Sequence, residues 1–232
     1  MKCTPLKDSV FKLQKVAGTG PKRLHMHSGS MPYEEWRDLR RHYIGASEVS
    51  TILGLNRYSG PFDLACVKLG RVDPEAPGIA LTMGTFFEPA IRDFFADEMR
   101  NERVNIPGGI DPDAAVSPYP YTIRHAELAM FCCNLDGVIM PSDDGSVWGL
   151  EIKDAGTYAA GELRHWIEGD KPEGVALMYW IQIQAQLSVT GLDRFMIAIR
   201  CDKNLMCGPV YRNDKAISSI EAQVRAYWDR YL

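Results

Sequence analysis

The chain has 232 residues, of which 46% are apolar and 24% charged, with a formal net charge of −4. These values are typical of a water-soluble globular protein with one core, and they exclude a protein coated in basic residues. The chain contains no run of about 18 apolar residues and opens on no apolar signal core, so we expect neither a membrane span nor secretion. The expected compartment is the cytoplasm.

Positive charge is concentrated at the start of the chain. Residues 1–30 contain six Lys or Arg and one acidic residue, a balance of +5, which leaves −9 for the remainder. We predict a basic N-terminal arm over 1–30 and a single domain over 31–232. Such an arm can follow a line of phosphates, although a solvated tail is the more common reason for its charge.

Apolar residues at helical spacing dominate the first part of the domain. We predict helices over about 33–43, 45–53, 61–69 and 81–99. Residues 105–120 are rich in Pro, Gly and Asp and predict an extended loop, which leads into a short strand at 121–124.

Glu88 lies within the apolar stripe of the helix predicted at 81–99 and has two interpretations. Thr85-Phe86-Phe87-Glu88 matches the capping box S/T-x-x-E, and Pro89 is most favourable near a helix start. Alternatively, Glu88 is a buried functional carboxylate. The local pattern leaves both interpretations open.

Residues 131–154 predict a β-hairpin. Two apolar runs, 131–140 and 147–153, flank Pro-Ser-Asp-Asp-Gly-Ser at 141–146, which supplies the turn. Side chains alternate between the faces of a strand, so Glu151 and Lys153 share one face of the second strand. The hairpin is the element around which the rest of the chain is organised.

Asp136 is expected on the same face as this Glu and Lys. Leu135 and Ile139 have the parity of core residues, which places Asp136 opposite them and beside Gly137, where a metal or a phosphate can approach closely. Asp136, Glu151 and Lys153 are therefore expected to converge.

Two adjacent carboxylates repel each other unless a cation lies between them. A set of oxygen ligands suits Mg²⁺ or Mn²⁺ better than zinc. Lys153 can hold the attacking water and offset charge that builds on a phosphoryl group, so Asp…Glu-x-Lys is a set suited to phosphodiester hydrolysis. The alternative is a surface hairpin with a salt-bridged Glu and Lys, because so short a motif often matches by chance.

The last part of the chain is expected to complete the sheet and cover it. A glycine-rich segment at 155–174 precedes a long helix at 173–190 that closes at Gly191. Strands are predicted at 195–199 and 206–211, followed by an amphipathic helix to the end of the chain. On the long helix, one face carries hydrogen-bonding side chains rather than apolar ones: Tyr179, Gln182 and Gln186.

Four groups of residues follow one another along the chain: Trp36-x-x-Leu39-Arg40 with Gly45-Ala46-Ser47-Glu48; Met83-Gly84 with Glu88; Leu135-Asp136-Gly137 with Glu151-Ile152-Lys153; and Tyr179-x-x-Gln182-x-Gln184 with Gly191. Each group alone is a weak match. In this order, over about 36–191, they resemble the phage lambda exonuclease and YqaJ-like viral recombinase nucleases of the PD-(D/E)xK superfamily. The resemblance favours the site interpretation of Glu88.

The resemblance implies an α/β fold in which a central mixed sheet is flanked by helices around a restriction-endonuclease-like core. It implies a metal-dependent exodeoxyribonuclease that degrades one strand of linear duplex DNA from 5′ to 3′ and leaves a 3′ single-stranded tail for phage-type recombination. Two Mg²⁺ ions are expected as cofactors, with Mn²⁺ able to substitute. One departure is the gap of fourteen residues between Asp136 and Glu151, which is longer than in the lambda enzyme.

The resemblance also assigns catalytic roles at the hairpin. Asp136 and Glu151 are expected to bind metal together with the carbonyl of Ile152. Glu88 supports the metal site, and Lys153 serves the nucleophilic water.

Four further residues are expected to contact DNA. Tyr179 and Gln182 position the scissile phosphate or the water. Arg40 and Ser47 bind a 5′-phosphate, because Ser47 follows small residues at a helix start, where free N–H groups favour an anion. The alternative is that Ser47 is only an N-cap and Arg40 a surface cation.

The partners implied are double-stranded DNA ends, two further copies of the chain in a trimeric ring, and a single-strand-annealing recombinase, with a phage or prophage origin in a bacterial host. Two other functions remain open. One is an endonuclease of restriction or repair type with the same metal site, and the other is a non-enzymatic scaffold that binds DNA ends.

Overall fold

The computed structural model describes residues 24–27, 32–74, 76, 78–104, 110–140 and 147–232. Its strands are β1 (Leu24–His27), β2 (Ile44–Gly45), β3 (Ala115–Arg124), β4 (Phe131–Met140), β5 (Trp148–Asp154), β6 (Arg194–Cys201) and β7 (Asn204–Tyr211). Its helices are α2 (Tyr33–Arg41), η1 (Ala46–Glu48), α3 (Val49–Ile52), α4 (Pro61–Lys68), α5 (Ile79–Arg100), η2 (Thr157–Ala159), α6 (Ala160–Ile167), α7 (Gly174–Thr190) and α8 (Asp214–Tyr231).

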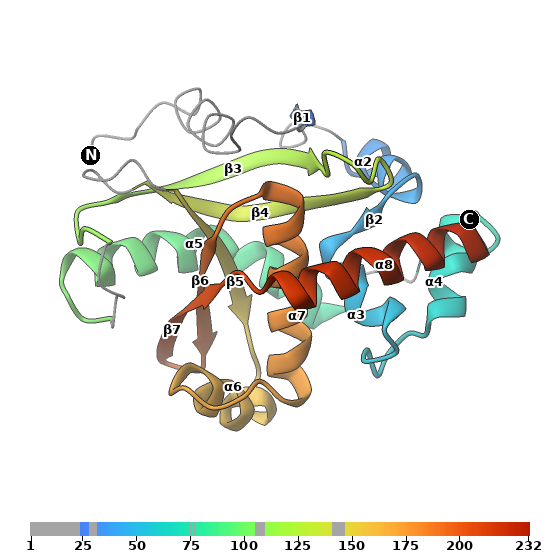
Figure 1. Ribbon diagram of the computed structural model, residues 1–232. Helices are drawn as coiled ribbons and strands as arrows, with labels where there is room; N and C mark the ends of the chain where they lie inside the picture. The colour runs from blue at the N-terminus through green and yellow to red at the C-terminus, as the bar shows by residue number, and fades with distance from the viewer. Residues whose placement is uncertain (1–23, 28–31, 75, 77, 105–109, 141–146) are drawn as a thin grey trace.

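These strands form one mixed sheet with helices on both faces (Figure 1). The order is β1-β3-β4-β5-β6-β7, and β2 pairs with β4. The β5–β6 and β2–β4 pairs are parallel, and the other pairs are antiparallel. The predicted mixed sheet flanked by helices is confirmed, whereas the turn predicted at 141–146 and most of the predicted arm lie outside the described residues.

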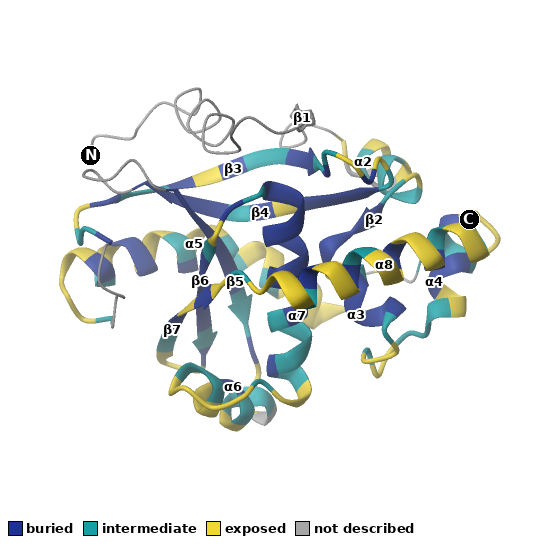
Figure 2. Ribbon diagram, in the orientation of Figure 1, coloured by how far each residue is buried: buried dark blue, intermediate teal, exposed yellow. Residues whose placement is uncertain are grey.

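The sheet separates two apolar cores, and β6 shows how the sequence builds both. Phe195, Ile197 and Ile199 pack with α7 and α8 on one face, while Met196 and Ala198 pack with α5 on the other. This alternation is the period of two expected of a strand that is buried on both faces. Figure 2 shows the central strands buried between the helices. None of the described helices is both long and apolar enough to cross a lipid bilayer.

Helix α5 begins earlier than the capping-box interpretation requires. It starts at Ile79, so Thr85, Glu88 and Pro89 all lie inside it. The hydroxyl of Thr85 donates to the Leu81 carbonyl at 3.1 Å instead of capping a helix start. The capping-box interpretation of Glu88 is therefore wrong, and Pro89 is accommodated within the helix, where it removes one N–H donor.

Strand β3 begins at Ala115, so the loop predicted over 105–120 is wrong from that residue on. Pro118 and Pro120 predicted a loop because proline cannot donate a hydrogen bond to a neighbouring strand. The strand accommodates them with two shifts of register against β4, between Ser117 and Tyr119 and between Tyr119 and Ile123.

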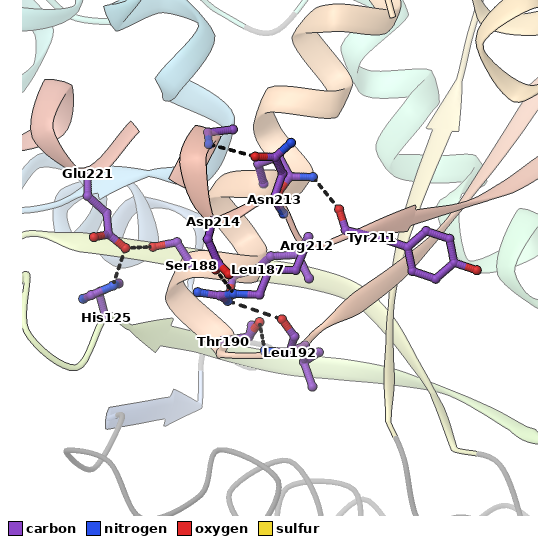
Figure 3. A network of polar contacts seen from close by, with 12 residues as sticks. His125, Leu187, Ser188, Thr190, Leu192, Tyr211, Arg212, Asn213, Asp214 and Glu221 are labelled. Carbon is purple, nitrogen blue, oxygen red and sulfur yellow. Dashed lines mark hydrogen bonds and ion pairs between the residues drawn. The ribbon is translucent and has the colours of Figure 1, made fainter. Parts of the chain in front are cut away.

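Polar contacts fix the carboxyl end of α7 against α8 (Figure 3). The hydroxyl of Ser188 donates to Glu221 Oε1 at 2.6 Å, and His125 Nε2 lies 3.4 Å from the same oxygen. Gly191 closes the helix with a φ of 74°, as predicted. Helix α7, whose earlier turns face the hairpin, is therefore held in place at its carboxyl end.

Candidate active site

Strand β4 carries a one-residue bulge at the site. Ser117 of β3 pairs with Val138 and Tyr119 pairs with Leu135, so two steps along β3 correspond to three along β4. As a result Leu135 packs in the α7 core and Ile139 in the α5 core. The expectation that both face one core is wrong, because the extra residue exchanges the faces of the strand. Such bulges often re-aim a side chain beside an active site.

Gly137 is required by close packing within the protein. A Cβ atom at this position would lie 2.9 Å from the Ser117 carbonyl oxygen and 3.3 Å from both Arg92 Cδ and Leu150 Cδ2. The space that a side chain at position 137 would occupy is thus filled by protein atoms, and this packing is sufficient to explain the glycine.

Asp136 reaches across to β5. Its Oδ2 accepts a hydrogen bond from the backbone N–H of Ile152 at 2.6 Å. Within the described residues, no group donates a hydrogen bond to Oδ1. One oxygen fixes the carboxylate, and the other is available to a ligand.

The side chains of β5 alternate as predicted. Trp148, Leu150 and Ile152 pack in the α5 core, whereas Glu151 and Lys153 face α7. Lys153 Nζ donates to Glu151 Oε1 and lies 5.2 Å from the centre of the Tyr179 ring.

Two glutamines of α7 hold Glu151, which is only 1% exposed. Gln182 Nε2 donates to Oε1 at 2.6 Å, and Gln186 Nε2 donates to Oε2 at 2.6 Å. The structure thus brings Gln182 and Tyr179 to the acidic residues, as expected. The contact of Gln186 with Glu151 is an addition, and the only sign of it in the sequence was its place on the same face of the helix.

Glu88 reaches the site from α5. Its Oε1 lies 3.5 Å from Arg92 Nη1, and that nitrogen also donates to the Asp136 carbonyl at 2.8 Å. Arg92 therefore connects α5 to the bulge of β4. No sequence motif identified Arg92, although it follows Glu88 by one helical turn.

Three carboxylates influence one another in this site. Burial, followed by the charge of Glu151, raises the pKa of Asp136 well above its usual value. Burial also raises the pKa of Glu88, to which Glu151 adds. Burial alone would lower the pKa of Lys153, but the charges of Glu151 and Asp136 raise it above its usual value. The site concentrates negative charge that a cation would stabilise.

The donor chemistry fits Mg²⁺ or Mn²⁺, which prefer oxygen ligands. Over the described ranges, however, no three His, Cys, Asp or Glu side chains are grouped closely enough to hold a metal as they stand. Asp136 and Glu151 lie on the adjacent strands β4 and β5, and each retains an acceptor position. The negative charge of Glu88 contributes to the raised pKa of Asp136.

Arg40 and Ser47 lie together at the edge of the domain, as expected. Arg40 Nη2 is 3.4 Å from Ser47 Oγ and 2.9 Å from Glu48 Oε1. Glu48 Oε2 accepts the backbone N–H of Gly45 at 2.8 Å, so Ser47 is not the cap of η1.

Lys68 supports this edge from α4. Its side chain is 3% exposed and donates to Glu48 and to the carbonyls of Arg40 and Tyr43, at 2.7 and 2.6 Å for the carbonyls. Burial lowers the pKa of Lys68. Glu48 and Lys68 were not identified from the sequence as a pair, because nothing local indicates a contact across twenty residues.

The mixed sheet and the positions of Asp136, Glu151 and Lys153 agree with the expectation of a PD-(D/E)xK fold. A model of the YqaJ-like viral recombinase domain matches residues 35–193, and the chain belongs to that family. The predicted resemblance is confirmed.

Similar proteins agree with this assignment. An uncharacterised protein YqaJ of Bacillus subtilis (strain 168) is 28% identical over 211 residues, which cover 88% of this chain and 58% of that protein. The chain thus spans a little over half of this relative's length.

Solved structures share the fold. An alkaline exonuclease from Laribacter hongkongensis superimposes with a TM-score of 0.61 at 22% identity, over 85% of this chain and 92% of that one. A phage related exonuclease from Haemophilus somnus 129PT gives 0.55 at 11% identity, over 84% and 96%.

Proposed function

We propose that the protein is a Mg²⁺-dependent exodeoxyribonuclease that degrades one strand of linear duplex DNA from 5′ to 3′ and leaves a 3′ tail for recombination. The observation that carries the proposal is the convergence of Asp136, Glu151 and Lys153, with Gln182 bonded to the glutamate. DNA binding alone would not require this set. The solved structures with the same fold include exonucleases, one of them also determined in complex with dAMP.

Asp136 and Glu151 would hold the metal, with the carbonyl of Ile152 as a further oxygen ligand and Glu88 as support. Two ions are proposed, and Mn²⁺ should substitute for Mg²⁺. When bound, the metal supplies a Lewis acid that lowers the pKa of water and withdraws charge from a phosphoryl oxygen.

The residues of the chain supply the remaining chemistry. Because the pKa of Lys153 is raised, its ammonium is protonated at neutral pH and acts as a hydrogen-bond donor that orients the attacking water and offsets charge on the phosphate. The Tyr179 ring limits the positions of this ammonium. Gln182 donates to Glu151 and, through its place beside the carboxylate, helps to position the phosphate or the water.

Arg40 and Ser47 are proposed to bind the terminal 5′-phosphate. Arg40 has five N–H donors, and the described residues accept hydrogen bonds only from Nη2, which leaves Nε and Nη1 for an anion. A terminal phosphate carries about one more negative charge than an internal diester, so this site should select an end.

A trimeric ring is the proposed assembly, acting with a single-strand-annealing recombinase in the cytoplasm of a phage-infected or prophage-bearing bacterium. Ile79, Leu81 and Phe86 at the start of α5 are exposed apolar side chains, and such surfaces mark interaction sites. With a net charge of −4, the chain needs its Lys and Arg concentrated on an inner channel to hold DNA.

Incubation with Mg²⁺ and either linear or circular duplex DNA tests the proposal. Progressive loss of one strand from the linear substrate, with circular DNA intact, is expected. Cleavage of the circular substrate would indicate an endonuclease, and binding of linear ends without hydrolysis would indicate a scaffold. A radiolabel at either end of one strand gives the direction of degradation.

A further inference from the structure

Gln186 is a buried amide whose hydrogen bonds join the two strands of the hairpin. Its side chain is 1% exposed, and Nε2 donates to Glu151 Oε2 at 2.6 Å and to the Asn134 carbonyl at 3.1 Å. Both N–H groups of the amide are therefore used. The amide cannot be reversed, because its oxygen would then face a carboxylate oxygen at the same distance.

These bonds lie at the bulge of β4. Asn134 precedes Asp136 by two residues, and Glu151 lies on the neighbouring strand, so one side chain from α7 spans both strands that carry the acids. Gln182 contacts the other oxygen of Glu151 from one helical turn earlier. With a donor on each oxygen, the plane of the Glu151 carboxylate is fixed.

The donors also determine which position of Glu151 stays open. A carboxylate offers about four acceptor positions, two on each oxygen. Lys153 and Gln182 use those of Oε1, and Gln186 uses one of Oε2. One acceptor position on Oε2 therefore remains, and Gln186 determines its direction.

A purely structural explanation of Gln186 is incomplete. Its Oε1 is buried and, among the described residues, has no hydrogen-bond partner. An unsatisfied buried acceptor destabilises a fold. Gln186 thus has an acceptor that destabilises the fold, while both of its N–H groups bond the strands that carry the site.

We propose that Gln186 is a positioning residue that orients the carboxylate of Glu151 toward the divalent cation and the reacting phosphate. The inference rests on the proposed nuclease function and deepens it. Partners that orient a metal ligand commonly change metal affinity or activity by about 10- to 100-fold when they are removed.

Gln184 provides a matched control on the same helix. It is 0% exposed, its Nε2 donates to the Tyr211 carbonyl at 2.9 Å, and its Oε1 accepts the Asn213 N–H at 2.9 Å. Tyr211, the last residue of β7, and Asn213, the N-cap of α8, are labelled in Figure 3. Gln184→Met and Gln186→Met each remove one buried amide with two hydrogen bonds, but only the second contacts Glu151.

The two variants are compared by thermal unfolding, by kcat and KM on linear duplex DNA, and by calorimetric titration with Mn²⁺. Both should lower Tm. Gln186→Met should reduce kcat or the affinity for Mn²⁺ by about 10- to 100-fold with KM for DNA unchanged, because Gln186 is too buried to touch DNA. Gln184→Met should retain wild-type kcat and Mn²⁺ affinity.

Equal kcat and Mn²⁺ affinity in Gln186→Met and wild type would overturn the inference, as would equal losses in both variants. If Gln186→Met does not fold, Gln186→Asn keeps an amide but shortens its reach, and is judged by the same criteria. A wild type that binds Mn²⁺ without degrading DNA would reject the proposed function, while the Mn²⁺ affinities would still decide the role of Gln186. A wild type that binds no Mn²⁺ would overturn both.

Discussion

Asp136 takes the place of a backbone acceptor for Ile152. The regular pairing of β4 with β5 runs from Ile139 opposite Trp148 to Gly137 opposite Leu150, and beyond it Asp136 Oδ2 accepts the Ile152 N–H at 2.6 Å. Asp136 therefore has a role in the sheet as well as in the proposed chemistry, and substitutions can separate the two.

Asp136→Asn should abolish DNA hydrolysis with little change in Tm, because the amide oxygen still accepts from Ile152 but the charge is lost. Asp136→Ala should abolish hydrolysis and also lower the free energy of unfolding by about 1–3 kcal/mol, since it leaves a buried N–H unsatisfied. Urea unfolding and a nuclease assay of both variants check this. Full stability of Asp136→Ala would contradict the role in the sheet.

Lys153→Ala should reduce kcat by about 100- to 1,000-fold, because it removes the cation that offsets charge on the phosphate. Its affinity for Mn²⁺ should be retained, since an ammonium does not bind metal and here competes with one for Glu151. Single-turnover rates and calorimetry provide the two measurements. Lys203→Ala, at an exposed lysine, is the control and should behave as wild type.

Wild type should degrade duplexes with 5′-phosphate ends faster than those with 5′-hydroxyl ends. Arg40→Ala should lose most of that preference, because one charge-assisted hydrogen bond is worth about 1.5–3 kcal/mol, or roughly 10- to 100-fold in rate. Arg41→Ala is the matched control, since Arg41 pairs with Asp73 and Asp38. Equal wild-type rates on both ends would remove Arg40 from the mechanism.

Lys68→Met should lower the free energy of unfolding by about 3–5 kcal/mol, because it removes the buried cation of the ion pair with Glu48 and a hydrogen-bond donor to the carbonyls of Arg40 and Tyr43. It should also weaken the preference for a 5′-phosphate, because Arg40 then provides the remaining cation for Glu48. Denaturant unfolding and the end-preference assay report the two effects. Unchanged stability would show that the contact contributes little.

Light scattering should give the mass of three 26.0 kDa chains at micromolar concentration. A second sample is the variant Phe86→Glu, chosen because Phe86 is an exposed apolar residue of α5. If Phe86 lies at a subunit contact, the trimer should weaken in this variant, because burial of an unpaired charge is unfavourable. A wild type that stays monomeric with and without DNA would rule out the ring.

The sequence predicted those parts of the fold that depend on local periodicity. The limits of β4 and α7, and the shared face of Glu151 and Lys153, follow from spacing alone. The bulge at Asp136 could not be predicted, because one extra residue leaves no periodic pattern within so short a strand. Strand β3 was missed where tertiary pairing outweighs the local preference of proline.

Site residues that belong to a motif could be predicted from the sequence, and those outside the motifs could not. Tyr179 and Gln182 lie where the family resemblance placed them. Gln186 was recognised only as a member of the same polar helix face, without its contact to Glu151. Arg92 and Lys68 contact site residues through long-range packing, and no local pattern identifies them. Their roles became visible only when the helices were placed against the sheet.

The bulge of β4 makes strand length, as well as residue type, part of the site. Deletion of one residue between Leu135 and Val138 would restore a regular strand. Every side chain on one side of the deletion would then point to the opposite face of the sheet. Ile139, for instance, would leave the α5 core for the α7 core. A side-chain replacement leaves the register of the strand unchanged, whereas a deletion here shifts it, so deletions should be tolerated less at this point than in the surface connections of the chain.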